Sequence, residues 1–305
     1  IGIAGFEDRG FSFIDRAISL NKKFKKAIGI EYKPFNKKNR IAELREKLPK
    51  ITETHESWLT YDRFDPNGFV SDFGKKKDIW SLPNIIIDIS GMSKFLIIAI
   101  LQLLDDYNGN VHIIYSEAKI YHPTPEEFNA QKENLPEKSP TFLTKDVYDI
   151  KTIPALSSIE MQGYPILIVA FPSFNYSELV ALLDKMNPQH LIKIEGIPHE
   201  EINAWRNQAI HCLNEKIDES CSFDIKKIIH RNITTFDYRD LVVSLDEIFK
   251  VYRYSHKFVI APTGSKLQAF GIFIFKQMHP EIHIVYPVTK EHTEEYSDGL
   301  RNIWH

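Results

Sequence analysis

The two halves of this chain repeat the same blocks of residues in the same order. The paired blocks are residues 6–18 and 171–183, 30–34 and 194–198, 64–94 and 236–266, and 115–119 and 286–290. General similarity between any two halves built of strands and helices explains the shared apolar positions. Because Glu, Asp and Lys also coincide at the expected strand ends, we infer an internal duplication.

Each half alternates apolar strands with amphipathic helices. The expected strands lie near 2–6, 26–32, 56–60, 84–89 and 110–116, and near 165–171, 190–195, 232–236, 257–262 and 281–286. The expected helices lie near 10–22, 38–48, 68–80 and 93–107, and near 175–186, 199–215, 239–253 and 265–278. Continuous apolar strands such as 85–87 and 166–169 are typical of a parallel sheet with helices on both faces. The sequence therefore predicts an α/β fold of two tandem Rossmann-like parallel-sheet units, related by an internal pseudo-two-fold duplication.

The boundary between the units is expected in a stretch rich in proline and charge. We expect the first unit over 1–120, an irregular connector over 121–163 and the second unit over 164–305. The connector is identified by its prolines and by the loss of apolar periodicity.

The composition describes a globular chain without a large charge excess. Of its 305 residues, 43% are hydrophobic, which excludes a disordered chain, and 38 Lys and Arg face 41 Asp and Glu. A net charge of -3 gives no overall attraction to duplex nucleic acid or to an anionic membrane. Any anion site must therefore be local.

Cysteine content and hydropathy bear on the compartment. Two cysteines, Cys212 and Cys221, are too few for a disulfide framework and suit a reducing compartment, so the cytoplasm is expected. The most apolar stretches, 95–104 and 267–275, are too short to cross a bilayer. The chain begins at Ile1 inside an expected strand, which is compatible with residues that precede it.

Two loops with the same chemistry follow the fourth expected strand of each half. They read Asp-Ile-Ser-Gly-Met-Ser-Lys over 88–94 and Ile-Ala-Pro-Thr-Gly-Ser-Lys over 260–266, and each opens a helix. Glycine allows close backbone approach, hydroxyls and helix N-terminal amides donate hydrogen bonds, and lysine supplies positive charge, so each loop suits a phosphate. An ordinary helix cap with a solvated lysine is the alternative for one loop alone. Neither loop has the P-loop spacing or G-x-G-x-x-G, which disfavours an ordinary ATPase or dehydrogenase.

Other polar residues fall at strand ends. Glu31 and Glu195 end the second strands, where an acid commonly binds ribose hydroxyls, although a surface carboxylate is an equal alternative. The first strand-to-helix turns differ, since one carries Asp8 and Arg9 and the other Ser173. Arg9 suits a bidentate phosphate contact, or an internal pair with Asp8 or Glu7.

The sequence thus gives a set of candidate ligand-binding residues. They are Asp8, Arg9, Glu31, Asp88, Ser90, Gly91, Ser93, Lys94, Ser173, Glu195, Thr263, Gly264, Ser265 and Lys266. The 12 histidines show no H-E-x-x-H or paired-cysteine spacing, so no metal site is predicted. No cofactor and no catalytic residue is assigned.

The two loops resemble the fourth-strand motif of the CRISPR-associated Rossmann-fold family, CARF, which reads T-G-G-T-K-x-M-A after an apolar strand and Asn or Asp. The similar stretches are IAPTGSKLQAFG at 260–271 and DISGMSKFLIIA at 88–99. Each departs from the motif by lacking one glycine of the pair, and Met92 takes that place in the first. With one glycine fewer, each loop leaves less room for a phosphate to approach the backbone, or it binds a different ligand.

The resemblance implies a sensor of a nucleotide messenger in prokaryotic antiviral defence. CARF domains pair about a two-fold axis and hold one cyclic oligoadenylate across both lysine loops, and a fused tandem, as in the related SAVED domains, makes the pairing internal. A nucleotide or cyclic oligonucleotide bound in a cleft between the halves is therefore expected, together with a separate effector protein or one that precedes Ile1. A standalone ring nuclease is a further possibility, in which a ligand 2′-hydroxyl attacks phosphate while Lys94 and Lys266 stabilise the charge.

Two other classes of function stay open. One is a hydrolase or transferase acting on a nucleotide or phosphosugar, with Asp8, Glu31 or Asp88 as acid or base. The other is a structural or interaction subunit of a defence complex whose cleft binds nothing. Sensing ranks first because no well-placed general base is evident.

Overall fold

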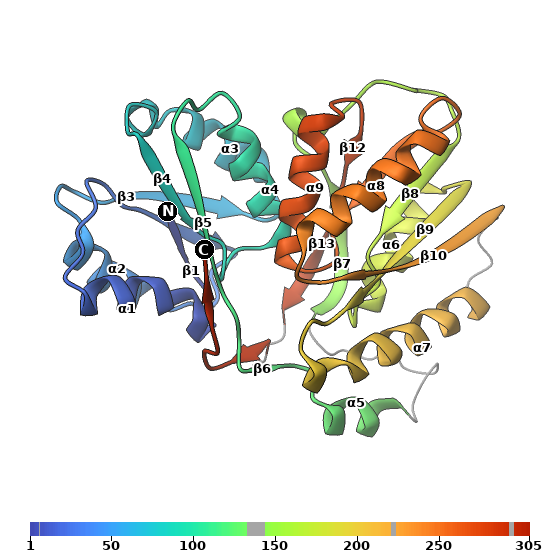
Figure 1. Ribbon diagram of the computed structural model, residues 1–305, viewed down its shortest axis with the longest axis horizontal. Coiled ribbons are helices and arrows are strands. Elements are labelled where there is room, and N and C mark those ends of the chain that lie inside the picture. Colours follow the sequence, from blue (N-terminus) through green and yellow to red (C-terminus); the bar gives the residue numbers. More distant parts are fainter. Residues whose placement is uncertain (6, 133–143, 221–223, 293–295) are drawn as a thin grey trace. The chain divides into compact units, whose positions relative to one another are not determined.

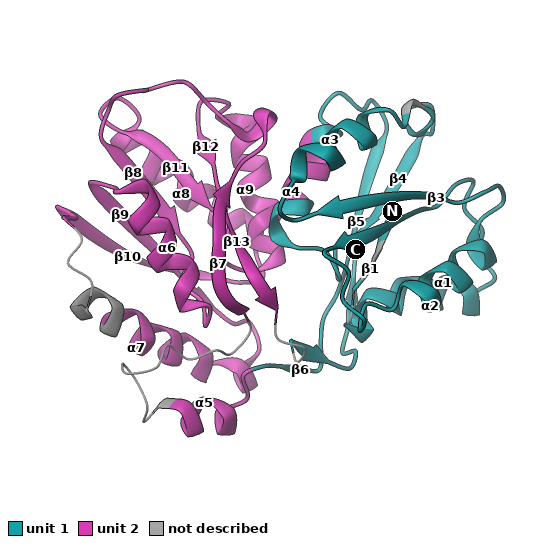
Figure 2. Cartoon of the chain, turned by 180° about the vertical axis from the view of Figure 1, so that it is seen from behind, with its two compact units in different colours: residues 1–96, 103–122, 294–305 teal, residues 97–102, 123–293 magenta. Residues whose placement is uncertain are grey.

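The computed structural model describes the chain except for residues 6, 133–143, 221–223 and 293–295. Phe6 and Cys221 thus lie outside the described residues. The chain divides into two compact units, of which unit 1 comprises 1–96, 103–122 and 294–305, and unit 2 comprises 97–102 and 123–293 (Figure 2). Both are α/β units built on parallel strands, as predicted.

Among its described residues, unit 1 has five strands that run parallel. β1 (Gly2–Ala4), β2 (Ile28–Lys33) and β3 (Ser57–Asp62) pair in that order, and β4 (Asn84–Asp88) pairs with β5 (Asn110–Ser116). The backbone of Ile1 joins the two groups, since its nitrogen donates to Ile86 O (2.7 Å) and its carbonyl accepts from Asp88 N (3.0 Å). Counted along the chain, the strand order is 3-2-1-4-5.

The helices of unit 1 follow the strands in alternation. They are α1 (Ser12–Ser19), α2 (Ile41–Lys47), α3 (Pro66–Gly74) and α4 (Lys94–Leu103). Of α4, residues 97–102 belong to unit 2. Phe11, Ile14, Leu44 and Leu48 form one buried cluster under α1 and α2. The residues of α4 from Phe95 to Leu101 are all buried, which agrees with a helix that is apolar on every side.

Unit 2 has the same strand order in one five-stranded parallel sheet. Its strands are β8 (Ile166–Ala170), β9 (His190–Ile197), β10 (Lys227–Thr234), β11 (Lys257–Ala261) and β12 (His283–Ile284). They pair in the order β10-β9-β8-β11-β12, which is again 3-2-1-4-5. Shared strand order agrees with the inferred duplication without establishing it.

Helices cover both faces of the unit 2 sheet (Figure 1). They are α6 (Tyr176–Met186), α7 (Trp205–Ser220), α8 (Tyr238–Tyr252) and α9 (Lys266–Met278). On one face, Leu179 and Leu182 of α6 pack against Ile168. On the other, Phe249 of α8 and Phe275 of α9 pack against Phe258 of β11. This double burial explains why β8 is continuously apolar and why β11 is apolar after Lys257.

The expected connector contains regular structure, which corrects the prediction of an irregular segment. Within it lie β6 (Ile120–Tyr121), α5 (Pro125–Lys132), β7 (Thr144–Lys151) and a short 3-10 helix, Pro154–Leu156. β7 pairs antiparallel with β13 (Tyr286–His292). The side chains of β7 are mostly polar and only partly buried, so the strand carries a weak apolar signal.

The C-terminal residues lie in unit 1, whereas the expected second unit ran to 305. β14 (Ser297–Asp298) pairs with β6 and β15 (Ile303–Trp304) pairs with β5, both antiparallel. β10 also differs from the expected strand at 232–236, because it starts at Lys227 and carries exposed charged residues. None of the helices in the described ranges has the length and apolar character needed to span a membrane.

Candidate functional site

The loop after β4 is tied down by Asp88 and Ser90. Asp88 Oδ1 accepts hydrogen bonds from Ser90 N (2.9 Å) and Ser90 Oγ (2.5 Å), and Ser90 Oγ accepts from Ser116 N of β5 (2.8 Å). Ser90 is fully buried, and Asp88 nearly so. Burial raises the pKa of Asp88 to about 6, although the bonds from Ser90 oppose this rise. Both residues brace β4 against β5.

Tyr32 of β2 clasps the next part of the same loop. Its hydroxyl donates to Gly91 O (3.2 Å) and accepts from Ser93 N (2.6 Å). Burial raises the pKa of Tyr32, so the hydroxyl stays protonated and able to donate. Ser93 Oγ accepts from Leu96 N (3.3 Å) and thereby caps α4, whose first residue is the half-buried Lys94.

The charged candidates of unit 1 form internal ion pairs. Arg9 is 2% exposed and its Nη2 lies 2.7 Å from Glu7 Oε1, so of the alternatives for Arg9 the structure has the pair with Glu7. Asp8 Oδ1 lies 2.5 Å from Arg40 Nη1, and Glu31 pairs with Arg45 of α2. Arg9 Nη1 is buried without a hydrogen-bond partner. The turn that carries Asp8 and Arg9 lies against the loop after β4, since a Cβ on Gly10 would lie 3.7 Å from Gly91 Cα.

The loop after β11 is held by its own hydroxyls. Thr263 Oγ1 donates to Phe171 O (2.8 Å), and Ser265 Oγ donates to Thr235 O (2.6 Å). Ser265 and Gln268 form a capping box at the start of α9, whose first residue is Lys266. A Cβ on Gly264 would come within 2.2 Å of Gln268 Oε1, so a larger residue here displaces the Gln268 side chain from the capping box. Ser173 Oγ accepts from Asn175 N (3.1 Å) within its own turn.

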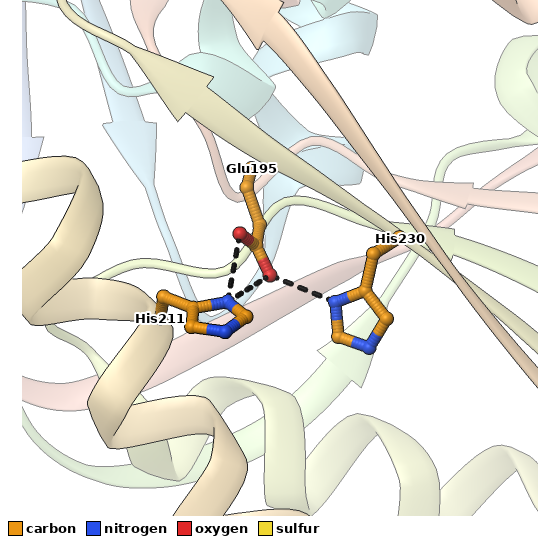
Figure 3. A group of neighbouring side chains, drawn as sticks. All are labelled: Glu195, His211 and His230. Carbon is orange, nitrogen blue, oxygen red and sulfur yellow. Dashed lines mark hydrogen bonds and ion pairs between the residues drawn. The ribbon is translucent and has the colours of Figure 1, made fainter.

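Glu195 lies between two histidines (Figure 3). His230 Nδ1 of β10 is 2.8 Å from Glu195 Oε1, and His211 Nδ1 of α7 is 3.0 Å from both carboxylate oxygens. The Glu195 side chain is 5% exposed, and the histidines 41% and 40%. Burial raises the pKa of Glu195, but the hydrogen bonds from both histidines outweigh it and leave the pKa below its ordinary value. The bond to Glu195 raises the pKa of His211.

The corresponding place in unit 1 has different chemistry. Strand register pairs Lys193 with His230 in unit 2, and Gly29 with Trp58 in unit 1. The Trp58 ring covers Gly29, and the Arg45 guanidinium lies 4.4 Å from the Trp58 ring centroid while it pairs with Glu31. Glu31 and Glu195 lie two residues before the ends of β2 and β9, not at the strand ends as expected, and each meets a side chain from the helix that follows its strand. In unit 1 this group is the permanently charged guanidinium of Arg45. In unit 2 it is the imidazole of His211, and His230 of the neighbouring strand β10 adds a second imidazole.

Several residues that hold these sites were missed by sequence reasoning. Tyr32 and Gln268 hold the two loops by hydrogen bonds to Ser93 N and Ser265 N that form only in the folded chain. His211 and His230 are separated in the sequence and meet only at Glu195. Lys193 is fully buried inside the apolar strand β9. Lys193 and Glu195 lie two residues apart in this strand and therefore on the same face of the sheet. Two charged residues on one face of an apolar strand indicate polar partners there, and this signal is visible in the sequence alone.

Comparisons with known proteins identify no family. Neither a protein-family profile nor a curated protein matches the chain. The solved structure of Can2 from Sulfobacillus thermosulfidooxidans in complex with cyclic tetra-adenylate (cA4) is similar to part of it. The match covers 39% of this chain and 31% of that chain, with 21% sequence identity and a TM-score of 0.30. The chain therefore spans about a third of the length of Can2, and an alignment this partial supports no argument about function.

Proposed function

We propose that this chain binds an anionic nucleotide through its two Ser–Lys loops, 90–94 and 262–266. One observation supports the proposal most. In a 3-2-1-4-5 sheet the strand order reverses between the first and fourth strands, and ligands of such sheets bind beyond the carboxyl ends of the strands at that point. Both loops follow the fourth strand of their unit, so both lie at the end favoured for a ligand.

The hydroxyls of Ser90, Thr263 and Ser265 donate within the protein, so what these hydrogen bonds offer a ligand is a fixed loop backbone. Tyr32 holds the backbone of Gly91 and Ser93, while Thr263 and the capping box of Ser265 hold the second loop. A backbone fixed before the ligand arrives loses little entropy on binding. Helix N-termini favour anions, and the lysines that open α4 and α9 add charge.

The finer identity of the ligand comes from the resemblance of these loops to CARF domains. A cyclic oligonucleotide messenger of antiviral defence is the ligand that we propose, with a separate effector as partner. Binding without turnover is favoured because the carboxylates beside the first loop are already engaged, Asp8 by Arg40 and Asp88 by Ser90.

Calorimetric titration of the full chain with a panel of cyclic and linear oligonucleotides tests the proposal. We expect micromolar or tighter binding of a cyclic member, weakened at least tenfold by Lys94→Ala or Lys266→Ala. Lys75→Ala, which removes a 71% exposed lysine elsewhere, is the matched control and is expected to bind normally. The proposal is contradicted if the wild type binds no member of the panel. It is also contradicted if a variant carrying both Lys94→Ala and Lys266→Ala binds as tightly as the Lys75→Ala control. Chromatography of the incubated ligand detects turnover.

A further inference from the structure

The cluster of Glu195, His211 and His230 in unit 2 has a set of donor atoms that nothing in the proposed nucleotide binding uses. One carboxylate and two imidazole nitrogens converge from β9, α7 and β10 (Figure 3). All the donor atoms lie within 4.8 Å of one another. Their convergence raises the question of what ion or group they hold.

The donor types select the class of ligand. Two imidazoles with one carboxylate suit zinc and neighbouring transition metals, whereas Mg²⁺ and Ca²⁺ prefer oxygen ligands throughout. The buried carboxylate supplies the negative charge that a divalent cation needs.

The distances are close to those of a coordination sphere. A zinc ion about 2.0–2.1 Å from each of its ligands separates tetrahedral donors by roughly 3.3 Å. Here Glu195 Oε1 lies 2.8 Å from His230 Nδ1 and 3.0 Å from His211 Nδ1. To coordinate a zinc ion, Glu195 Oε1 and the two histidine Nδ1 atoms must move apart by a few tenths of an ångström. Both rings are partly exposed, so they have room to turn by that amount.

The outer ring nitrogen of His211 has a suitable partner. His211 Nε2 lies 3.3 Å from Glu215 Oε1, one helical turn further along α7. A histidine that binds a metal commonly donates its other N–H to a carboxylate, which fixes the tautomer and the ring orientation. When Nδ1 of His211 binds a cation, its remaining proton lies on Nε2, directed at Glu215.

Unit 1 shows that the fold does not require histidines at this place. There Glu31 is neutralised by Arg45 over Trp58, an arrangement that cannot bind a cation. The two imidazoles of unit 2 are therefore a feature of this site rather than of the architecture.

We propose that Glu195, His211 and His230 form a binding site for a divalent transition metal ion of the zinc class, with water completing the coordination. Because the two imidazoles are partly exposed, the coordination positions that the protein leaves open face solvent. Three protein ligands with an open position are the pattern of reactive zinc sites, whereas structural sites are closed by four. The site is independent of the nucleotide proposal, since it uses neither lysine loop.

Titration with Zn²⁺ tests the site directly. The full chain is stripped with a chelator and titrated in competition with a chromogenic chelator, and Co²⁺ is used in parallel because its visible spectrum reports imidazole coordination. We expect one equivalent to bind tightly, and Zn²⁺ to raise the midpoint of thermal unfolding. His211→Asn, His230→Asn and Glu195→Gln are each expected to weaken binding by more than tenfold.

Controls separate the site from other histidines and from misfolding. His279→Asn removes another histidine that faces a carboxylate, since His279 Nε2 lies 3.3 Å from Asp246 Oδ1, and is expected to bind Zn²⁺ like the wild type. Circular dichroism shows whether each variant folds, and the two partly exposed histidines offer folded variants even where Glu195→Gln does not fold. Failure of the wild type to bind Zn²⁺, or undiminished binding by folded His211→Asn and His230→Asn, overturns the proposal.

Discussion

Thr263 and Phe171 are joined by two hydrogen bonds through a single hydroxyl. Thr263 Oγ1 donates to Phe171 O (2.8 Å) and accepts from Phe171 N (3.2 Å). Thr263 follows β11 and Phe171 follows β8, the fourth and first strands of the sheet. The hydroxyl therefore ties the second lysine loop to the strand beside which we expect the ligand.

Thr263→Val removes both bonds while keeping the shape of the side chain. The buried N–H and C=O of Phe171 then lose their partner, and we expect the free energy of unfolding to fall by about 1–3 kcal/mol. Ligand affinity should fall as well, because the loop is less fixed. Denaturant unfolding and calorimetry measure the two effects. Thr263→Ser keeps the hydroxyl, and a loss equal to that of the valine variant contradicts the assignment.

Tyr32→Phe tests the corresponding support in unit 1. The change removes the acceptor of Ser93 N and the donor to Gly91 O, so we expect a loss of about 1–2 kcal/mol in the free energy of unfolding. Nucleotide affinity is expected to fall without any change in charge. Tyr148→Phe, at an exposed tyrosine, is the control. Unchanged stability and affinity in Tyr32→Phe show that the clasp is unimportant.

Gly264→Ala tests the requirement for glycine in the second loop. In the wild type, Gln268 Oε1 accepts a hydrogen bond from Ser265 N (2.8 Å). The new methyl group displaces this oxygen and lies 3.0 Å from Phe171 Cβ. We expect a loss of about 1–2 kcal/mol from the broken capping box. Gly74→Ala meets no atom within 4 Å and is expected to be neutral or slightly stabilising. Equal unfolding midpoints for the two variants run against this account.

His283 predicts a loss of stability in acid. Burial, with a smaller effect of Lys257 and Lys276, lowers the pKa of His283 from 6.5 to about 4, and Ser158 N donates to its Nδ1 (3.1 Å). The unfolded chain therefore binds the proton first, so the contribution of His283 is complete above pH 6.5 and declines as the pH falls towards 4. We expect a decline on the order of 2 kcal/mol.

The comparison with His283→Asn isolates this effect from opposing groups. The pKa of Asp88 is raised to about 6, so protonation of Asp88 stabilises the folded state as the pH falls below 6. Unfolding free energies of the wild type and the variant are measured from pH 7 to 4, and the difference between them should shrink in acid. A constant difference means that His283 does not titrate as described.

Most of the fold could be predicted because the central strands are buried on both faces. Residues 85–87 of β4 and the whole of β8 are unbroken apolar runs, and a helix begins after the serine-containing loop that follows each strand. β10 was misplaced because its first residues include Lys227 and Arg231, which face solvent at a sheet edge. β7, β14 and β15 pair antiparallel with segments far away in the sequence, so no local pattern reveals them.

The candidate site was predictable only in part. The lysine loops were found because their residue types repeat, but the groups that hold them come from other strands, as Tyr32 does. Arg9 and Glu31 were proposed for ligand contact, and folded neighbours engage both. The pairing of Glu195 with His211 and His230 depends on strand register and on how α7 packs, neither of which can be read from spacing.

The return of the last residues to β5 and β6 makes residues 123–293, the larger part of unit 2, an insertion within unit 1. No single proteolytic cut can release either unit as a whole, because the chain passes between them more than once. A fragment that ends at residue 120 would leave β5 without β15 and would expose a sheet edge. Keeping the strands of unit 1 together without residues 123–293 requires joining residue 122 directly to residue 294, so that both ends of the insertion are excised together.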